Sequence, residues 1–173
     1  NAAWNDGGRL PHMLLTGPPG VGKTTLAQLA AKETAATLIE RLGQVLANAS
    51  AVNGLLMEAK DKDIVFIDEI HEMPTSSQTL LYRAMEDRSV FLVGRDNRSL
   101  QLPVNDFVLV AATTDEYALL PPLRDRFKLI LPFSWYDAQD LTTIVIQHAA
   151  RTNVKIADGV AASIAERLKF SSL

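Results

Sequence analysis

The chain has 173 residues, of which 47% are apolar, enough for one domain with a sizeable core or for one domain and part of a second. Its formal net charge of −3 argues against broad, nonspecific binding of nucleic acid, although it does not exclude a local basic loop. The absence of cysteine excludes disulfides and thiolate metal sites. Neither a membrane span nor a signal peptide is recognisable, so we expect no membrane partner and a cytoplasmic location.

The first predicted strand, residues 12–16, leads into a glycine-rich turn and then a helix over residues 24–34, with Leu26, Leu29 and Ala30 on one face. The turn fits the phosphate-loop pattern of Gly, four residues, Gly, Lys, and Ser or Thr. Glycines let backbone N–H groups point at phosphate oxygens, and the dipole of the following helix favours an anion there. The candidate nucleotide-binding residues are Gly17, Pro18, Pro19, Gly20, Val21, Gly22, Lys23, Thr24 and Thr25.

Two side chains of this loop have expected roles. Lys23 can reach the β- and γ-phosphates of a nucleotide, and Thr24 can offer its hydroxyl to a magnesium ion. The alternative, a glycine-rich turn with a chance Lys-Thr, is disfavoured by the strand before it and the helix after it. The segment therefore predicts ATP and Mg²⁺ as ligands.

Further strands are expected at residues 37–40 and 64–68, and the second is continuously apolar, as in a strand buried on both faces. Asp68 and Glu69 come at its end. Ligands of open parallel sheets bind beyond the carboxyl ends of the strands, so both carboxylates should lie on the same edge as the phosphate loop. We expect Asp68 to hold magnesium and Glu69 to accept a proton from the attacking water. The alternative is a pair of solvated acids that cap the next helix.

His71, two residues beyond Glu69, has two interpretations. It could sense the state of the nucleotide by hydrogen bonding near Glu69, or it could be an ordinary polar residue at the start of a helix. His12 and His148 are interpreted as structural. Apart from the magnesium site, no cluster of residues has the spacing of metal ligands.

The rest of the chain predicts one further helix, a hairpin, two strands and a helical ending. The helix is expected over residues 75–87, and the hairpin has strands at 89–93 and 98–102. Strands at 107–112 and 128–133 complete a doubly wound parallel α/β sheet. Helices follow at 137–151 and 158–170. We therefore predict a nucleotide-binding domain over residues 1–133 and the start of a small helical lid over residues 134–173.

Four segments occur in the order expected of an AAA+ ATPase: the phosphate loop, Asp-Glu-Ile-His at 68–71, Ala-Ala-Thr-Thr at 111–114 and Pro-Leu-Arg-Asp-Arg-Phe at 122–127. The chain most resembles the RuvB-type ATPases, which drive branch migration of Holliday junctions. The resemblance implies the P-loop NTPase fold, a three-layer sandwich with a five-stranded parallel sheet, an inserted hairpin and a helical lid. It also implies an ATP hydrolase that acts as a helicase-type motor in DNA recombination and repair.

The same resemblance implies roles for residues near the end of the sheet. Thr113 and Thr114 lie where the family keeps a polar residue that senses the γ-phosphate; either could do so, and Thr114 is the first choice. Arg126 resembles the arginine finger, a catalytic group that enters a neighbouring subunit's site, with Arg124 as the runner-up. A finger supplied in this way requires a homo-oligomer, typically a hexameric ring.

The hairpin resembles the one by which RuvB-type subunits bind their junction-recognising partner. It is shorter than in the family, and its tip carries Arg95, Asp96 and Arg98, so a solvated hairpin without a partner is the alternative. The family's second sensor arginine has no counterpart in residues 169–173. The family's adenine-contacting segment and its winged-helix domain are expected to lie outside these residues. The contacts to DNA are expected to lie in that winged-helix domain.

Two other functions stay open at the level of the sequence. One is a clamp-loader-like or protein-remodelling AAA+ ATPase, and the other is a nucleotide-gated assembly module with little hydrolysis. The hairpin and the Asp-Glu-Ile-His segment favour the branch-migration motor. Glu69 argues against the assembly module, because a protein that does not hydrolyse ATP has no need of a general base.

Overall fold

The computed structural model describes residues 10–93 and 99–170. The chain divides into two compact units between residues 133 and 134. The first unit is built on a five-stranded sheet of order β2-β3-β6-β1-β7 in which every pairing is parallel. Its strands are β1 (Met13–Thr16), β2 (Leu38–Leu42), β3 (Ile64–Asp68), β6 (Val108–Thr113) and β7 (Leu129–Pro132). The predicted doubly wound α/β sheet is thereby confirmed.

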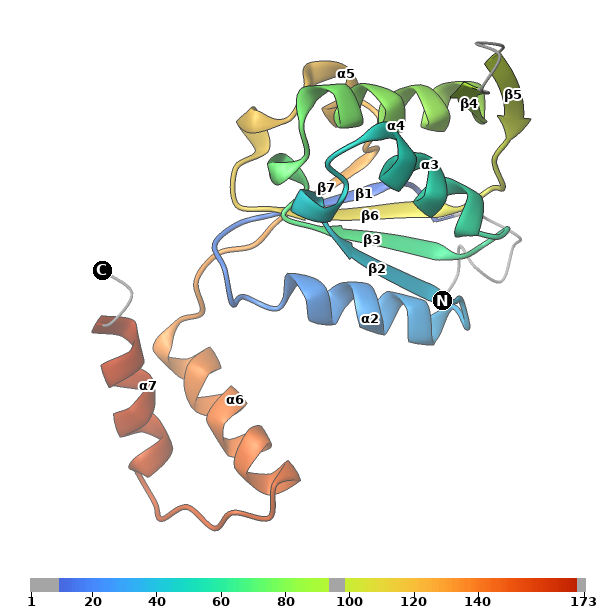
Figure 1. Cartoon of the computed structure of the whole chain (residues 1–173). Helices are drawn as coiled ribbons and strands as arrows, with labels where there is room; N and C mark the ends of the chain where they lie inside the picture. The colour runs from blue at the N-terminus through green and yellow to red at the C-terminus, as the bar shows by residue number, and fades with distance from the viewer. Residues whose placement is uncertain (1–9, 94–98, 171–173) are drawn as a thin grey trace. The chain divides into compact units, whose positions relative to one another are not determined.

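Helices cover both faces of this sheet, as Figure 1 shows, with α2 on one face and α3 and α4 on the other. The α-helices of the first unit are α2 (Lys23–Glu33), α3 (Ala49–Glu58), α4 (Thr75–Asp87) and the single turn α5 (Pro121–Arg124). Three short 3₁₀ turns, η1 (Gly43–Val45), η2 (Ile70–Glu72) and η3 (Glu116–Ala118), follow β2, β3 and β6. The result is the predicted three-layer sandwich.

Two apolar cores lie on opposite faces of the sheet, and β3 contributes to both. Ile64 and Phe66 pack with Ala27 of α2, whereas Val65 and Ile67 belong to the larger core under α3 and α4. Successive side chains of a strand point to opposite faces, which is why a strand buried on both sides is apolar throughout. This burial fixes the register of β3 and therefore the position of the residues that end it.

Helix α2 faces the sheet with small residues. Its buried positions are Lys23, Ala27 and Ala31, which follow one another at the spacing of a helix face. Of the residues predicted to share one face, Leu26 and Ala30 are partly buried against the core, whereas Leu29 is 50% exposed. Alanines at the contact let the helix approach the strands closely.

A two-stranded antiparallel hairpin, β4 (Ser89–Val93) and β5 (Ser99–Pro103), follows α4 (Figure 1). Its base is fixed by the buried Val90 and by Asn53, whose Nδ2 donates to the carbonyl of Phe91 at 3.4 Å. The hairpin is as predicted, with its second strand one residue later. Its predicted tip, with Arg95, Asp96 and Arg98, lies outside the described residues, as do residues 171–173.

The second unit consists of α6 (Ala138–Arg151) and α7 (Val160–Phe170), which pack against each other. Ala161 and Ala165 are buried in it, whereas Ile144, Ile164 and Leu168 are more than a third exposed. The helices lie where they were predicted, but their large apolar residues are less buried than the predicted stripes suggest.

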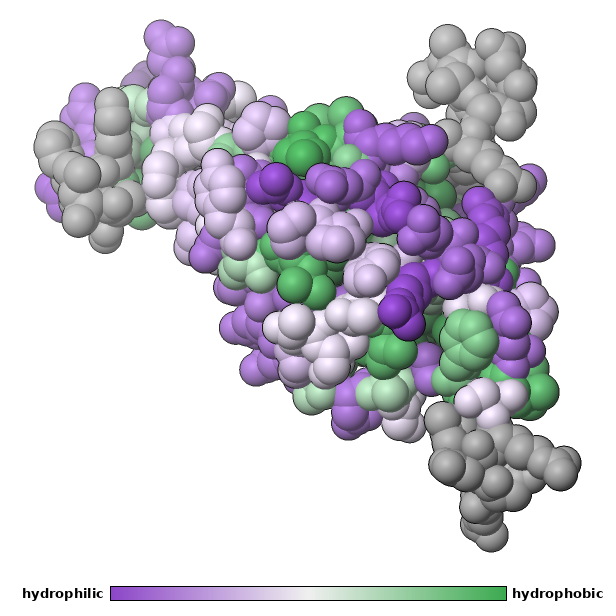
Figure 2. Space-filling view, turned by 90° about the horizontal axis from the view of Figure 1, so that it is seen from above, coloured by the Kyte–Doolittle hydropathy of each residue, from purple (hydrophilic) through white to green (hydrophobic). Residues whose placement is uncertain are grey.

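The described helices are too short or too polar to span a lipid bilayer. Seen from above Figure 1, the surface shows mostly hydrophilic side chains with small, separate apolar spots (Figure 2). Single exposed apolar residues of this kind are normal on protein surfaces.

Candidate functional site

Three adjacent strands bring the predicted site residues to one edge of the sheet. Strand β6 lies between β1 and β3. Thr16, the last residue of β1, pairs with Thr113, and Ile67 of β3 pairs with Ala111. The carboxyl ends of neighbouring parallel strands share an edge, and ligands bind there. The phosphate loop, the two acids that follow β3 and the threonines that end β6 therefore lie together.

The phosphate loop depends on its glycines. Gly17, Gly20 and Gly22 have φ values of 139°, 77° and 93°, in the range that side chains disfavour. Gly17 also passes so close to the chain end of β7 that a Cβ there would lie 2.3 Å from the carbonyl oxygen of Phe133. Gly22 is the N-cap of α2, so the loop runs straight into a helix N-terminus, where backbone N–H groups attract anions.

Lys23 is held inside this loop. The residue is only 6% exposed, and its ammonium donates to the carbonyl oxygens of Gly17 at 2.7 Å and Pro18 at 2.8 Å. Val21, 1% exposed, anchors the loop in the protein, while Pro19 and Gly20 are exposed. The positive charge is thus concentrated at the loop, where it favours phosphate binding.

Thr24 and Asp68 form the oxygen pair that was predicted for magnesium. Thr24 Oγ1 donates to Asp68 Oδ2 at 3.4 Å, which joins the first turn of α2 to the end of β3. Within residues 10–93 and 99–170, no group of three or more His, Asp or Glu side chains could hold a metal by itself. Mg²⁺ usually takes one or two protein ligands and completes its shell with phosphates and water. A hydroxyl and a carboxylate fit that chemistry.

Glu69 has an unusual backbone, with φ 47° and ψ 51° in the left-handed region. A residue without glycine's freedom costs about 1–2 kcal/mol there, and such strain is frequent at functional sites. The end of β2 approaches it closely, because a Cβ on Gly43 would lie 2.2 Å from the Glu69 carbonyl oxygen. The carboxylate Oε2 accepts from both the N–H and the hydroxyl of Thr114 at 3.3 Å.

The two threonines at the end of β6 lie in different surroundings. Thr113 is fully buried, and its hydroxyl contacts His71 Nδ1 at 3.0 Å and the backbone of Asp115. Thr114 is exposed and bonds Glu69. His71 Nδ1 also lies 3.2 Å from Glu69 Oε2, so the structure brings this histidine to the acid, as the first of its two interpretations required.

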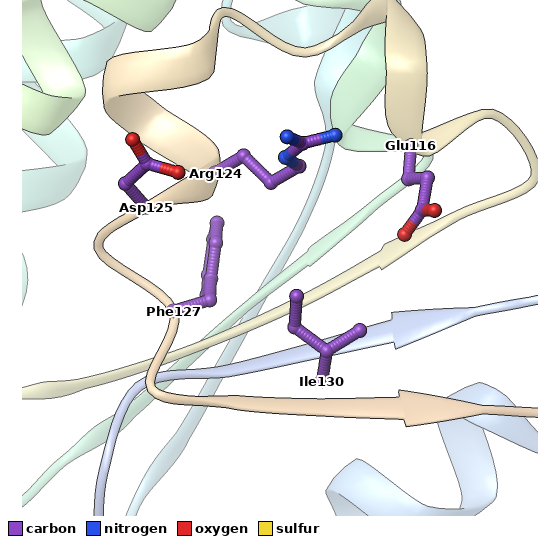
Figure 3. A pocket seen from close by; sticks show the side chains of 5 residues that line it. All are labelled: Glu116, Arg124, Asp125, Phe127 and Ile130. Atoms are coloured by element: carbon purple, nitrogen blue, oxygen red, sulfur yellow. The ribbon is translucent and has the colours of Figure 1, made fainter.

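The two candidate finger arginines also differ. Arg126 Nη2 pairs with Glu86 Oε1 of α4 at 2.7 Å, whereas the guanidinium of Arg124 lies 5.9 Å from the ring centre of Tyr117. An open hollow of about 400 Å³ lies beside Arg124, which reaches across it toward Glu116 (Figure 3). Its lining residues are Glu116, Arg124, Asp125, Phe127 and Ile130, none of which belongs to the phosphate loop.

Sequence reasoning missed two residues that the structure places against this machinery. Gly43 was not singled out, since a glycine directly after a strand is ordinary in a turn and its approach to Glu69 follows only from the fold. Glu86 was not singled out either, since an acid on an exposed helix face carries no local signal. Both act through contacts between segments that are distant in the chain.

Comparison with known proteins agrees with this geometry. Residues 1–133 match the family described as the Holliday junction DNA helicase RuvB P-loop domain. A solved structure of a substituted Thermotoga maritima RuvB is 37% identical over 96% of this chain, with a TM-score of 0.87. Thermotoga maritima RuvB described as the Holliday junction branch migration motor is also 37% identical over 96% of this chain, with a TM-score of 0.83. In both, the match covers 52% of the solved chain, so this chain spans about half of their length. The chain belongs to the RuvB family, whose P-loop domain it contains.

Proposed function

We propose that this chain is the ATP-hydrolysing core of a ring-forming motor that moves DNA branches during recombination and repair. The observation that carries the proposal is the convergence of the phosphate loop, the Thr24–Asp68 pair and Glu69 at one edge of the sheet. Membership of the RuvB family supports branched DNA as the substrate of the motor, since the Thermotoga protein is described as a branch migration motor.

The residues divide the work of hydrolysis. The N–H groups of the loop and the Lys23 ammonium bind the β- and γ-phosphates. Thr24 and Asp68 hold Mg²⁺, which neutralises phosphate charge when it is bound. Glu69 orients the attacking water and accepts its proton, and Thr114 contacts the γ-phosphate. These groups are preorganised by the sheet edge, which is the main way in which proteins accelerate phosphoryl transfer.

The site is completed by a second copy of the chain in this proposal. Arg126 enters the neighbouring site as the finger, a group worth about 10³–10⁵ in rate. Both candidate arginines have a contact within their own subunit, Arg124 with Tyr117 and Arg126 with Glu86, so the choice of Arg126 rests on its resemblance to the finger of the family. A finger in trans implies a homo-oligomer, and the family suggests a hexameric ring.

The proposal also assigns roles to the hairpin and to the two helices of the second unit. The hairpin receives a junction-recognising partner, and the exposure of Phe91 and Leu100, 49% and 58%, supports a contact surface there. Helices α6 and α7 begin a small lid. DNA is engaged by parts of the protein beyond these residues, and the work takes place in the cytoplasm.

The test uses full-length protein with and without four-way DNA junctions. We expect Glu69→Gln to bind ATP normally and to lose about 10²–10⁴-fold in turnover, because the general base is removed. Glu72→Gln, a change at an exposed acid of η2, is the matched control and should turn over normally. Turnover of wild-type protein should rise with four-way junctions. Full activity of Glu69→Gln would refute the assignment of the base. Turnover that does not change with four-way junctions would refute branched DNA as the substrate.

A further inference from the structure

His71 lies between the candidate catalytic base and the buried end of β6. Its Nδ1 is 3.2 Å from Glu69 Oε2 and 3.0 Å from Thr113 Oγ1. The ring is held on η2, directly after the fully buried Ile70, and its side chain is only 23% exposed. One nitrogen atom therefore faces two oxygen atoms of different character, a carboxylate at the site and a hydroxyl in the core.

The hydrogen bonds of Thr113 determine what that nitrogen presents. The N–H of Asp115 donates to Thr113 Oγ1 at 3.0 Å, and the hydroxyl donates its single proton to the Asp115 carbonyl at 2.9 Å. With that proton committed, Oγ1 can only accept from His71. The network thus assigns a proton to Nδ1, and the same N–H faces Glu69 Oε2.

The other contacts of Glu69 go to the same carboxylate oxygen. Oε2 accepts from the N–H and the hydroxyl of Thr114 at 3.3 Å, in addition to its contact with His71. These donors hold one oxygen of the carboxylate, so Oε1 is the oxygen that can face the attacking water of the proposed reaction. A long side chain on a left-handed backbone needs such support, since a misplacement of about 1 Å can cost about a hundredfold in rate.

We propose that His71 is a positioning residue for hydrolysis, which donates from Nδ1 to Glu69 Oε2 and orients this carboxylate toward the attacking water. Thr113 acts one contact further out by fixing the tautomer of His71, and it does not touch the nucleotide. The inference rests on the proposed function, in which Glu69 is the base. It also assigns the two adjacent threonines different tasks, with Thr114 at the γ-phosphate and Thr113 behind His71.

The test compares three substitutions of His71 in full-length protein. His71→Leu removes the donor, His71→Asn keeps an amide N–H near the position of Nδ1, and His71→Gln moves it toward that of Nε2. We expect His71→Leu to lower kcat about 10- to 100-fold, with KM and ATP affinity changed by less than about twofold. His71→Asn should recover most of kcat and His71→Gln much less. His148→Leu, the same change at an exposed histidine of α6, should leave kcat unchanged.

Thr113 supplies an independent arm of the test. Thr113→Val keeps the shape of the side chain and removes the hydroxyl, so we expect it to lower kcat in the same direction. Combined with His71→Leu it should add no further loss, because both changes break one chain of contacts. Additive losses would show that Thr113 acts separately and would overturn that part of the inference.

The outcomes separate this inference from the proposed function. Normal kcat in His71→Leu alongside an inactive Glu69→Gln refutes the role of His71 alone, whereas an active Glu69→Gln refutes the proposed base. If His71→Leu does not fold, the comparison of His71→Asn with His71→Gln decides, since both keep a polar amide. Equal kcat in those two variants would show that the position of the donor is irrelevant and would overturn the inference.

Discussion

At the scale of single residues, the structure distinguishes two adjacent threonines that the sequence could not tell apart. Thr113 and Thr114 follow the same apolar strand, and either could have been the γ-phosphate sensor from sequence alone. Thr113 is the last residue of β6, a strand that is buried along its whole length, whereas Thr114 lies just beyond its end. The structure buries Thr113 against His71 and Asp115 and exposes Thr114 beside Glu69. This difference supports Thr114 as the sensor.

His12 provides a prediction at the same scale. Its Nδ1 accepts a hydrogen bond from the backbone N–H of Leu109 at 2.9 Å, which ties the start of β1 to β6. Burial lowers the pKa of His12 below 6.5, and the positive charge of Arg88 lowers it further. Protonation of Nδ1 would break the bond to Leu109, since a protonated nitrogen cannot accept. The native state therefore favours neutral His12.

The sign of the pH effect follows from linkage. Below pH 6.5 the unfolded chain takes up a proton that folded His12 does not, so stability is lost as the pH falls toward the folded pKa. His12→Asn keeps an acceptor near the position of Nδ1 and has no such titration. We expect its free energy of unfolding, measured by urea denaturation between about pH 5 and about pH 7, to fall less with acid than that of wild type. Parallel curves for the two proteins would contradict the prediction.

At the scale of elements, the sequence predicted every strand of the sheet to within two residues at either end, because β1, β3 and β6 are apolar runs bounded by turn or site residues. The sequence could not predict which face of a helix packs against the sheet. The sequence put Leu26, Leu29 and Ala30 on one face of α2, but the residues that the sheet buries are Ala27 and Ala31. Periodicity alone cannot set that rotation.

The contact between the end of β2 and Glu69 yields the next prediction. Gly43→Ala would place a Cβ 2.2 Å from the Glu69 carbonyl oxygen, and both backbones would have to move. We expect a loss of about 1–3 kcal/mol in stability and a fall in kcat, because Glu69 is displaced. Denaturant unfolding and steady-state ATPase assays on full-length protein measure the two effects.

Gly54 is the matched control for that substitution. It lies on the exposed side of α3, and a Cβ there would contact nothing within 4 Å. Gly54→Ala should leave kcat unchanged and stabilise the helix by up to about 1 kcal/mol, through helix propensity. If Gly43→Ala behaved like Gly54→Ala in both assays, the close approach to Glu69 would have no role in hydrolysis.

At the scale of the whole molecule, a parallel, doubly wound sheet could be inferred from alternating strands and helices, but the partner of Arg126 could not. Arg126 lies in a turn after α5, and Glu86 lies near the end of α4, forty residues earlier in the chain. Only the fold brings them within 2.7 Å. Side chains that are 40% and 50% exposed form a pair worth at most about 1 kcal/mol to stability. We therefore expect this ion pair to matter for the orientation of the Arg126 side chain and little for stability.

Mixed assemblies can locate that role in one subunit. Full-length Arg126→Ala subunits keep Glu69, and Glu69→Gln subunits keep the finger, so a mixture should regain partial ATPase activity if the finger acts in trans. Adding Glu86→Gln to the Glu69→Gln subunit should lower this rescue about 10- to 100-fold, because its finger loses the carboxylate that aims it. Adding Glu86→Gln to the Arg126→Ala subunit should change nothing, since that subunit has no finger to orient.

The same mixtures contain their own controls. Without rescue at any ratio, although the subunits still assemble, Arg126 is not a finger in trans. Rescue that is insensitive to Glu86→Gln in either subunit would leave Arg126 as the finger and remove Glu86 from its support. Equal sensitivity in both subunits would indicate a general effect on assembly, because aiming a guanidinium affects only the subunit that carries it. A defect confined to the finger donor would show that a weak surface ion pair, of little value to folding, sets the geometry of a site in the next subunit.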